Sequence, residues 1–406
     1  MKIELLKSRI DKLAGQMQSG DLAVIFANEL PAMPVPFLQD KNFVYFTGLE
    51  IPKAIFVLQK VKEKAVPTLF IERGIPEREV WEGKKMTLAA AQELTGIESV
   101  QYLDLFRSHI SAKLASVSRL IVNTNYTHMD DALDRRGNFV RKARERFIQL
   151  DCLSLNKLMP QLRMEKDAWE IEQLSHAIEL TAKGIKRIYR EAKAGMNEAE
   201  LEAILRFEAV ANQAKHLGFS PIIASGENAT TLHYENNNCE IGENDLVLLD
   251  VGAAWNNYSA DISRTFPVAG KFSARQKEVY AAVLAVQKEI IALIKPGVTM
   301  QELNSKTIEL ISQALKDLGL IQDDSEIKKY YMHSIGHHLG LDTHDLADRA
   351  KPLSPGCVIT IEPGIYIKAE KIGVRIEDDI LVTETGYRNL SESIPKEIAD
   401  LEELCK

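Results

Sequence analysis

The spacing of hydrophobic positions changes along the chain, and each spacing predicts a different kind of element. In the first 150 residues, short apolar runs alternate with segments in which apolar residues recur every three or four positions. These patterns predict strands at 22–26, 54–58, 67–71 and 120–122, and helices at 4–17 and 88–94. Strands that alternate with helices indicate an α/β unit. This half shows no catalytic cluster, and we expect its two histidines, His109 and His128, at the surface.

From about residue 160 onward, the amphipathic segments are longer. Helices are expected at 165–194, 198–217, 274–294 and 300–318, and strands follow each helix pair. This order suggests an internal duplication of the fold, although no clear sequence repeat accompanies it. The change of pattern near Leu158-Met-Pro160 predicts two domains, residues 1–158 and residues 159–406.

Composition then narrows the classes of function. The 406 residues carry a net charge of −8 without a long basic run, which argues against a nucleic-acid partner. No apolar stretch reaches the ~18 residues of a membrane span, and the first residues lack a signal-peptide core. The four cysteines are scattered, without the spacing of a zinc site. We therefore expect a cytoplasmic protein without a membrane partner.

One predicted hairpin carries two acidic residues in an otherwise apolar stretch. Asn256-Asn257 suits a two-residue turn with positive φ at both positions. In that register Asp250 and Asp261 are diagonal neighbours on adjacent strands, with Cα atoms roughly 7–8 Å apart. Two facing carboxylates repel each other, and a bound divalent cation would remove the conflict because it takes carboxylate oxygens. The alternative is two acids at solvated strand ends.

A histidine-rich segment, residues 331–345, follows the second helix pair. His333 and His337 are four residues apart, which is the spacing of two ligands on one helix face. Gly336 and Gly340 argue against a stable helix, so we predict an irregular loop that presents imidazoles to a cleft. A histidine-rich surface loop is the alternative, and the apolar residues between the histidines count against it.

Two glutamates stand inside apolar runs near the C-terminus. Glu362 follows the run 358–361 and precedes Pro363, and an unpaired carboxylate would be costly to bury there. Arg375 and Glu377 are two residues apart in a predicted strand, so they share a face. A surface acid or a surface ion pair is the alternative for each position.

The charges of these residues suggest a pair of metal ions. The acidic residues are Asp250, Asp261, Glu362 and Glu377. Two divalent cations would balance these four carboxylates, with His337 as a nitrogen ligand and Arg375 offsetting a bridging hydroxide. Oxygen ligands with one imidazole suit Mn²⁺, Co²⁺ or Fe²⁺. Two such ions can activate one water molecule and hold a carbonyl oxygen.

The motifs around these residues resemble the Xaa-Pro aminopeptidases (aminopeptidase P), a branch of the pita-bread metallopeptidases whose relatives include the prolidases. The matching motifs are Ser225-Gly-Glu-Asn with Leu232-His233-Tyr, Asp250-Val-Gly through Asp261-Ile-Ser-Arg-Thr-Phe-Pro267, His337-His-Leu-Gly-Leu-Asp-Thr-His344-Asp, Glu362-Pro-Gly-Ile-Tyr and Arg375-Ile-Glu377-Asp-Asp. They span most of residues 220–380. In the N-terminal half, Tyr45-Phe-Thr-Gly48 and Val80-Trp-Glu-Gly83 resemble the same family.

The resemblance implies a fold and an activity. The fold is an α/β N-terminal domain, for oligomerisation and cleft closure, followed by an α+β catalytic domain of the pita-bread (creatinase/aminopeptidase-like) type. The implied activity is that of a dinuclear metalloaminopeptidase, which removes the N-terminal residue from peptides with proline in the second position. The implied cofactor is a pair of divalent ions, Mn²⁺ first, with Co²⁺, Zn²⁺ and Fe²⁺ as alternatives.

The resemblance also assigns roles to individual residues. The implied metal ligands are Asp250, Asp261, His337, Glu362 and Glu377, with Asp261 and Glu377 bridging the two ions. The implied catalytic residues are Glu362, His344, His233, His333 and Arg375. Glu362 would exchange a proton with the bridging water and pass it to the prolyl nitrogen. His344 would lie near the oxygen that becomes negative.

The resemblance further implies a homodimer or a homotetramer. Trp81 is a large aromatic residue in a charged segment, and in the family the matching tryptophan reaches toward a neighbouring subunit. A tryptophan packed on its own domain is the alternative.

The chain departs from the family at two places. The loop 346–350 reads Leu-Ala-Asp-Arg-Ala where the family has Val-Gly and then an aromatic residue, and His338 stands where the family often has a large aromatic residue. The loop leaves a prolidase acting on Xaa-Pro dipeptides as one alternative, with Arg349 as the cation that would bind their carboxylate. A binding protein that kept the fold and lost the chemistry is a further alternative, which the intact ligand set disfavours.

Overall fold

The computed structural model describes residues 1–31, 35–124, 126 and 128–405. Contacts within the chain divide it into two units, Met1–Leu162 and Arg163–Lys406. The boundary predicted after residue 158 lies close to this division. We describe each unit by itself.

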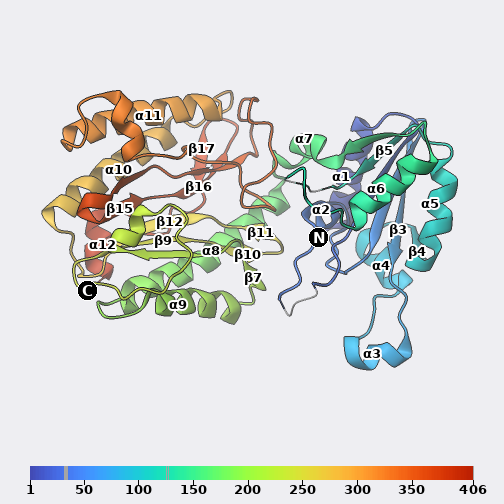
Figure 1. The fold of residues 1–406 in the computed structure, drawn as a ribbon, viewed down its shortest axis with the longest axis horizontal. Helices are drawn as coiled ribbons and strands as arrows, with labels where there is room; N and C mark the ends of the chain where they lie inside the picture. The colour runs from blue at the N-terminus through green and yellow to red at the C-terminus, as the bar shows by residue number, and fades with distance from the viewer. Residues whose placement is uncertain (32–34, 125, 127, 406) are drawn as a thin grey trace. The chain divides into compact units, whose positions relative to one another are not determined.

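The first unit is built around one six-stranded mixed sheet (Figure 1). Its strands are β1 (Asp21–Phe26), β2 (Ile55–Val61), β3 (Lys64–Ile71), β4 (Ser99–Tyr102), β5 (Arg119–Val122) and β6 (Asp151–Ser154). In space their order is β4-β3-β2-β1-β5-β6. Strand β1 pairs antiparallel with β2 and parallel with β5. The four strands expected here from apolar runs are confirmed.

Helices accompany both faces of this sheet. They are α1 (Ile3–Gln16), α2 (Lys41–Thr47), α3 (Pro76–Glu82), α4 (Leu88–Thr95), α5 (Phe106–Leu114) and α6 (Arg135–Arg146), with α7 (Pro160–Arg163) at the boundary. Side chains that alternate along β1, such as Leu22 and Val24, pack with Ile110 and Leu114 of α5. The opposite face is covered by α1, α2 and α4, which contact the sheet or one another.

One of the two surface predictions for histidines in this unit is wrong. His109 is half-buried, and its ring stacks edge-on against Phe70 with centroids 5.0 Å apart. Helical spacing in α5 places His109 next to the buried Ile110 and over the sheet. His128 is exposed, as predicted.

The second unit contains the four long helices that the sequence predicts. They are α8 (Ala168–Glu191), α9 (Glu198–Ala211), α10 (Ala274–Ala292) and α11 (Met300–Asp317), and a short α12 (Ile398–Leu404) ends the unit. Capping boxes at Asp167, Asn197, Ser273 and Thr299 begin the four long helices. The helix predicted at 198–217 is too long, because its last residues form strand β7 (His216–Leu217).

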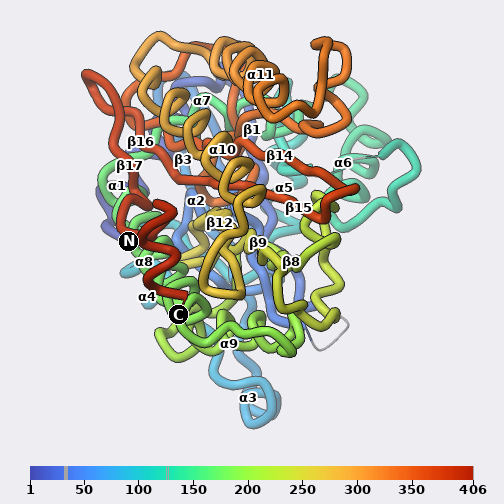
Figure 2. The backbone as a smooth tube through the Cα atoms, turned by 90° about the vertical axis from the view of Figure 1, so that its left-hand side faces the viewer, coloured from blue at the N-terminus to red at the C-terminus, as the bar shows by residue number. Residues whose placement is uncertain are grey.

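Strands follow each helix pair, in the predicted order. The first group is β7, β8 (Ile222–Ser225), β9 (Leu246–Val251), β10 (Ala253–Trp255), β11 (Tyr258–Ser259) and β12 (Ile262–Pro267). The second group is β13 (Val358–Ile361), β14 (Gly364–Ile367), β15 (Ile372–Arg375), β16 (Asp378–Val382) and β17 (Tyr387–Asn389). In Figure 1, α8 and α9 lie on one side of these strands and α10 and α11 on the other. Figure 2 shows α10 running over the strands.

A single large apolar core joins the helix pairs to the strands of the second unit. Ile178 and Ile185 of α8 and Val283 and Ile290 of α10 belong to it and are at most 1% exposed. Such packing fixes the strand ends from which polar side chains project. Among the residues that the structure describes, no helix combines the length and the apolar character needed to cross a membrane.

Candidate metal centre

Strand β9 and the hairpin that follows it carry the first two acidic residues of the site, Asp250 and Asp261. Asn256 and Asn257 have φ angles of 47° and 71°, which the predicted two-residue turn requires. Strand β9 then pairs with β12 so that Asp250 stands opposite Ser263. This is the predicted register, and it makes Asp250 and Asp261 diagonal neighbours on adjacent strands.

The histidine-rich segment 331–345 is described throughout and forms no helix, as predicted; it runs beside β13. Thr360 donates its backbone N–H to the carbonyl of His337 at 2.9 Å. A Cβ atom at Gly336 would stand 2.0 Å from the Thr360 carbonyl oxygen, so only glycine permits this approach. Nδ1 of His337 lies 3.1 Å from the His338 carbonyl oxygen. A proton on Nδ1 satisfies that carbonyl and leaves Nε2 free to act as a ligand.

Glu362 and Glu377 stand where the C-terminal strands exchange partners. Strand β13 pairs with β16 on one side of them, and β14 pairs with β15 on the other. The backbone N–H of Glu362 donates to Ile335 at 2.8 Å, and that of Glu377 donates to Ser263 at 3.0 Å. The strand predicted through Arg375 and Glu377 is therefore interrupted between them, because Glu377 turns its backbone toward β12.

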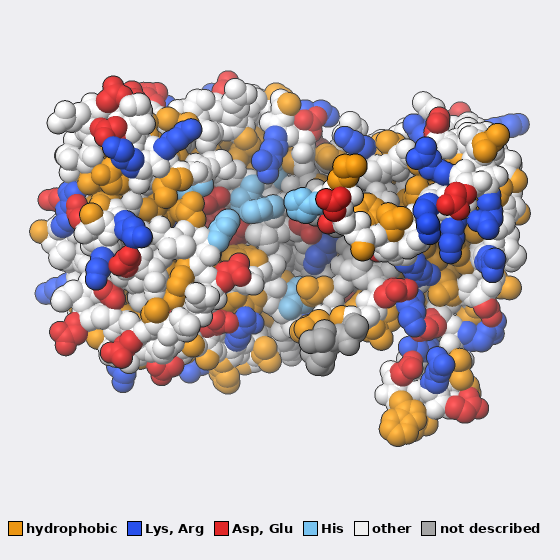
Figure 3. All heavy atoms as spheres, viewed as in Figure 1, with side chains coloured by type: hydrophobic (Ala, Val, Ile, Leu, Met, Phe, Trp, Pro, Cys, Tyr) orange, Lys and Arg blue, Asp and Glu red, His pale blue; other side chains and the backbone are white. Residues whose placement is uncertain are grey.

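A cavity of about 200 Å³ gathers these residues. It is lined by Leu232, His233, Asp250, Asp261, His333, Ser334, Gly336, His337, His344, Arg349, Glu362, Arg375 and Glu377. Every residue proposed from the sequence as a ligand or a catalytic group is on this lining. Within the described ranges, ligand atoms of Asp261, His337 and Glu377 lie within 4.8 Å of one another. Figure 3 shows histidine side chains gathered on the face that it presents, with acidic side chains beside them.

Burial and mutual repulsion disfavour the ionised form of three carboxylates in this cluster. Burial, followed by the charge of Asp250, raises the pKa of Asp261 well above its ordinary value. Burial, followed by the charge of Asp261, does the same to the pKa of Glu377. Burial raises the pKa of Glu362 to about 7, although His337 and Arg375 oppose the shift. The positive charge on the lining is therefore too small to balance these carboxylates in their ionised form.

Arg375 is the guanidinium that pairs with an acidic residue of the cluster. Its Nη2 donates to Asp250 at 2.7 Å, its Nε to Ser263 Oγ at 2.9 Å and its Nη1 to the Tyr366 hydroxyl at 3.0 Å. His333 Nε2 lies 2.9 Å from the same hydroxyl. Burial and the nearby Arg375 lower the pKa of His333 to about 4, so this imidazole is neutral at neutral pH.

The residues present fit divalent cations. Oδ1 of Asp250 is buried and has no hydrogen-bond partner among the residues that the structure describes. Arg375 pairs with Asp250, and an imidazole nitrogen, His337 Nε2, lies 3.3 Å from Asp261 and 3.8 Å from Glu362. Carboxylate oxygens with one imidazole are a donor set for Mn²⁺, Co²⁺ or Fe²⁺.

His233 and His344 line the outer part of the cavity. Both are exposed, and the His344 ring lies 4.2 Å from the His337 ring. Partial burial of the ring, followed by the nearby His337, lowers the pKa of His344, which favours the neutral ring with one N–H to donate. A second cavity of about 520 Å³ shares both histidines and extends to Phe219 and Thr343. This gives room for a ligand larger than an ion.

Sequence reasoning missed three residues that support the site. Ser263 donates from Oγ to Glu377 Oε2 at 2.7 Å, Tyr366 joins His333 to Arg375, and Asp379 accepts from the Asp261 backbone N–H at 3.2 Å. The signal for Ser263 was available, because it is two residues after Asp261 and shares its strand face. Asp379 and Tyr366 lie inside the motifs that carry the family resemblance, but their contacts depend on the fold and not on spacing along the chain.

Comparison with known proteins gives matches over the whole chain. The description "Metallopeptidase family M24" matches residues 172–384, and "Aminopeptidase P, N-terminal domain" matches residues 6–122. The chain is 36% identical to human Xaa-Pro aminopeptidase 3, over 98% of this chain and 84% of that protein. A Bacillus anthracis structure described as an aminopeptidase P is 39% identical with a TM-score of 0.97, covering 100% of this chain and 98% of the other. Aminopeptidase P from Escherichia coli with the inhibitor Pro-Leu is 30% identical with a TM-score of 0.91, at the same coverages.

Proposed function

The chain belongs to metallopeptidase family M24, and we propose from this membership that it is a metalloaminopeptidase that removes the N-terminal residue from peptides with proline in the second position. The observation that carries the proposal is the convergence of Asp250, Asp261, Glu362, Glu377 and the His337 imidazole in a single cavity, where burial and mutual repulsion disfavour the ionised carboxylates. The pita-bread fold of the catalytic unit agrees with it.

We propose that five side chains hold two divalent ions. They are Asp250, Asp261, His337, Glu362 and Glu377. Asp261 and Glu377 would help to hold both ions, as the family resemblance implies, and they are the most buried of the set, at 5% and 2% exposed. Mn²⁺ is the ion proposed first, and Co²⁺, Zn²⁺ and Fe²⁺ are the alternatives.

The chemistry follows from the residues around the proposed ions. A bound pair of divalent ions lowers the pKa of a water molecule and polarises the scissile carbonyl. Glu362 takes the proton of the attacking water at its carboxylate and delivers it to the prolyl nitrogen as the peptide bond breaks. His344, neutral and at the cavity edge, donates an N–H to the carbonyl oxygen as that oxygen becomes negative. His233 lies beside the same cavity and helps to orient the peptide.

Proline in the second position explains the need for a dedicated enzyme. Its nitrogen carries no hydrogen after acylation and its ring fixes φ, so a peptidase that relies on the amide hydrogen binds it poorly. A cavity that accepts the rigid proline ring binds such peptides selectively.

A metal-removal experiment tests the proposed function. The protein is freed of metal with a chelator, and its cleavage of Gly-Pro-Yaa and Gly-Ala-Yaa tripeptides is followed before and after Mn²⁺ is added. We expect no cleavage without metal, recovery with Mn²⁺, and cleavage of the proline peptide alone. Full activity of the metal-free protein, or equal cleavage of both peptides, would contradict the proposal.

One observation favours the prolidase as a second candidate. Arg349 lines the metal cavity, and no ion pair of its side chain is seen among the described residues. A free guanidinium there could bind the carboxylate that follows proline in a dipeptide. The ratio of kcat/KM for Gly-Pro-Yaa to that for Gly-Pro distinguishes the aminopeptidase from the prolidase. A kcat/KM about ten times higher for the dipeptide would favour the prolidase. In that case Arg349→Ala should abolish the advantage, while Arg388→Ala, an exposed arginine on β17, should preserve it.

We also propose that the chain forms a homodimer or a homotetramer through the segment that carries Trp81. The support is the exposure of this side chain, 88%, on α3. The cytoplasmic location and the lack of a nucleic-acid partner stay predictions from the sequence.

A further inference from the structure

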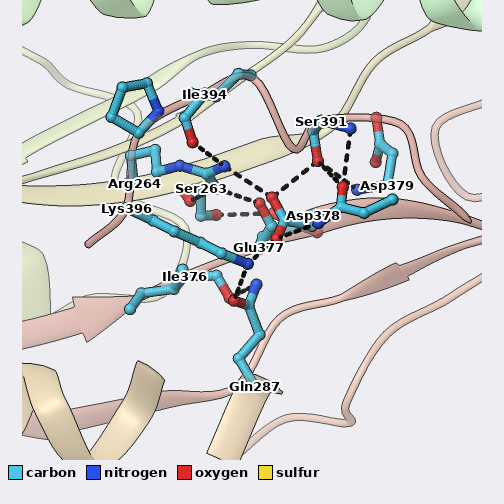
Figure 4. A network of polar contacts seen from close by, with 12 residues as sticks. Ser263, Arg264, Gln287, Ile376, Glu377, Asp378, Asp379, Ser391, Ile394 and Lys396 are labelled. Carbon is cyan, nitrogen blue, oxygen red and sulfur yellow. Dashed lines mark hydrogen bonds and ion pairs between the residues drawn. The ribbon is translucent and has the colours of Figure 1, made fainter. Parts of the chain in front are cut away.

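A buried polar network surrounds the strand segment that carries Glu377 (Figure 4). Arg264, Gln287 and Asp378 are 0% exposed, and the Lys396 side chain is 15% exposed. None of these residues lines the metal cavity. Charged groups are rarely buried to this extent unless their positions matter or each is paired.

Gln287, on α10, joins the two chain segments at the strand exchange. Its Nε2 donates to the carbonyl of Ile361 at 3.3 Å and to the carbonyl of Ile376 at 3.0 Å. These are the residues immediately before Glu362 and Glu377. One side-chain amide therefore ties together the two peptide groups from which the proposed glutamate ligands project.

Lys396 fixes the orientation of this amide. Its Nζ donates to Gln287 Oε1 at 2.7 Å and forms an ion pair with Asp378. A lysine ammonium can only donate, so it requires the amide oxygen to face it. The NH₂ group of Gln287 is thereby directed at the two carbonyls.

Arg264 holds the other side of Glu377. Its Nη2 donates to Asp378 Oδ1 at 2.7 Å, and its Nη1 donates to the backbone carbonyl of Glu377. Asp378 Oδ1 also accepts from Ser391 Oγ at 2.8 Å. The carbonyls before and after the Glu377 side chain are thus both held by buried side chains from other elements.

A glutamate has three rotatable bonds between its backbone and its carboxylate. A functional site needs its groups placed within roughly 0.5 Å, so the backbone below such a side chain must itself be fixed. At the strand exchange the ladder between β13 and β16 and the ladder between β14 and β15 both stop. The amide of Gln287 spans that gap.

We propose that Gln287, oriented by Lys396, is a positioning residue for the metal site, because it sets the separation between the backbones of Glu362 and Glu377. This inference rests on the proposed function, since it takes both glutamates as ligands. Residues that orient metal ligands typically account for 10–100-fold in metal affinity or activity.

The test is Gln287→Met, which keeps the length of the side chain and removes its donors and its acceptor. We expect a folded protein in which the weaker Mn²⁺ binds about tenfold less tightly by calorimetric titration, and in which kcat falls while KM for a Gly-Pro-Yaa peptide stays within twofold. Gln313→Met is the matched control, because Gln313 is exposed on α11 and, among the described residues, its one side-chain hydrogen bond is to Asp317 on the same helix. It should match the wild type in every measurement.

Lys396 variants provide an independent arm. Lys396→Met should lower the Mn²⁺ affinity in the same way, and Lys396→Arg, which keeps the donors, should restore most of it. In a Gln287→Met background, Lys396→Met should add little, because the lysine acts through the amide. If Gln287→Met does not fold, the Mn²⁺ affinities of Lys396→Met and Lys396→Arg test the positioning role instead.

The outcomes separate this inference from the proposed function. A wild-type protein that binds no Mn²⁺ or does not cleave would refute the proposed function. A wild-type protein that binds two ions, beside variants with unchanged affinity and kcat, would refute only the positioning role. A lower melting temperature with unchanged Mn²⁺ affinity would mean that the network is merely structural, and it would also overturn the inference.

Discussion

Glu362 has to serve two purposes, as a ligand and as the group that moves a proton. Glu362→Gln keeps an oxygen ligand and removes the exchangeable proton, so we expect kcat to fall by roughly 10²–10⁴-fold. The metal-free variant should remain folded, since the substitution removes one of several mutually repelling carboxylates. Rates and melting temperatures of this variant and of Glu384→Gln, an exposed glutamate, provide the comparison. A fully active Glu362→Gln would exclude the proton-transfer role.

At the scale of residues, the sequence predicted the members of the site better than their supports. Acids and histidines inside apolar runs are conspicuous because their burial is costly without a partner. Ser263 and Tyr366 are ordinary strand residues, and their roles depend on contacts that sequence spacing does not reveal. Ser263, for example, donates to Glu377, which is 114 positions away.

The loop that presents His337 depends on one close approach to β13. Gly336→Ala would place a Cβ atom 2.0 Å from the Thr360 carbonyl oxygen, so the loop must shift and carry His337 with it. We expect kcat/KM to fall at least tenfold. Gly386→Ala is the control, because a Cβ atom there meets nothing within 4 Å. Equal activities of the two variants would show that the loop absorbs the methyl group without moving the imidazole.

The segment around His344 is anchored by a buried charge cluster. Asp345, with its side chain 1% exposed, pairs with Arg163 and, at 2.9 Å, with Lys166. Burial alone would raise the pKa of Asp345, but these two cations outweigh it, and the pKa is lowered. The lowered pKa stabilises the fold above the ordinary carboxyl pKa, and this contribution disappears as the pH falls through the folded-state value.

Asp345→Asn therefore has a pH-dependent cost. At pH 7 it should lower the free energy of unfolding by about 3–5 kcal/mol, as breaking a buried pair does. The difference from the wild type should shrink below about pH 4, where the Asp345 carboxyl of the unfolded wild-type chain takes up a proton and the folded one does not. Urea unfolding at pH 7 and at pH 3.5 measures both values, and a difference independent of pH would exclude this explanation.

Long elements were predictable, and short or interrupted ones were not. Helices α8, α9, α10 and α11 were expected because their apolar spacing persists over several turns. Helices such as α2 and α3 have seven residues each, too few for a periodic signal. The exchange of strand partners beside Glu362 and Glu377 was invisible because the apolar pattern continues through it.

For the whole molecule, the exposed tip of the first unit suggests self-association. Val80 and Trp81 are 84% and 88% exposed on α3, which Figure 1 shows projecting from its sheet. We expect light scattering to give a multiple of 45.5 kDa. Trp81→Ala should weaken the assembly by about 2 kcal/mol, which is roughly 30-fold in dissociation constant. Phe207→Ala, another exposed aromatic residue, should not. A particle of 45.5 kDa at micromolar concentration would refute the assembly.

The proposed ligands follow both of the helix pairs in the second unit. Asp250 and Asp261 follow the first helix pair, whereas His337, Glu362 and Glu377 follow the second. An ion bound between them would act as a reversible cross-link. By mass action, free metal at 100 times its dissociation constant would stabilise the fold by about 2.7 kcal/mol. The melting temperature should therefore rise with Mn²⁺ concentration and fall with a chelator, and a melting temperature independent of metal would contradict this.

Because bound metal would stabilise the fold, the supply of metal would affect the lifetime of the protein as well as its reaction rate. Without metal, the two parts of the second unit that supply the ligands would separate more often and expose the core to proteases. Metal availability would then determine how long each molecule survives as well as how fast it works. Scarcity would reduce the amount of enzyme without any change in its synthesis.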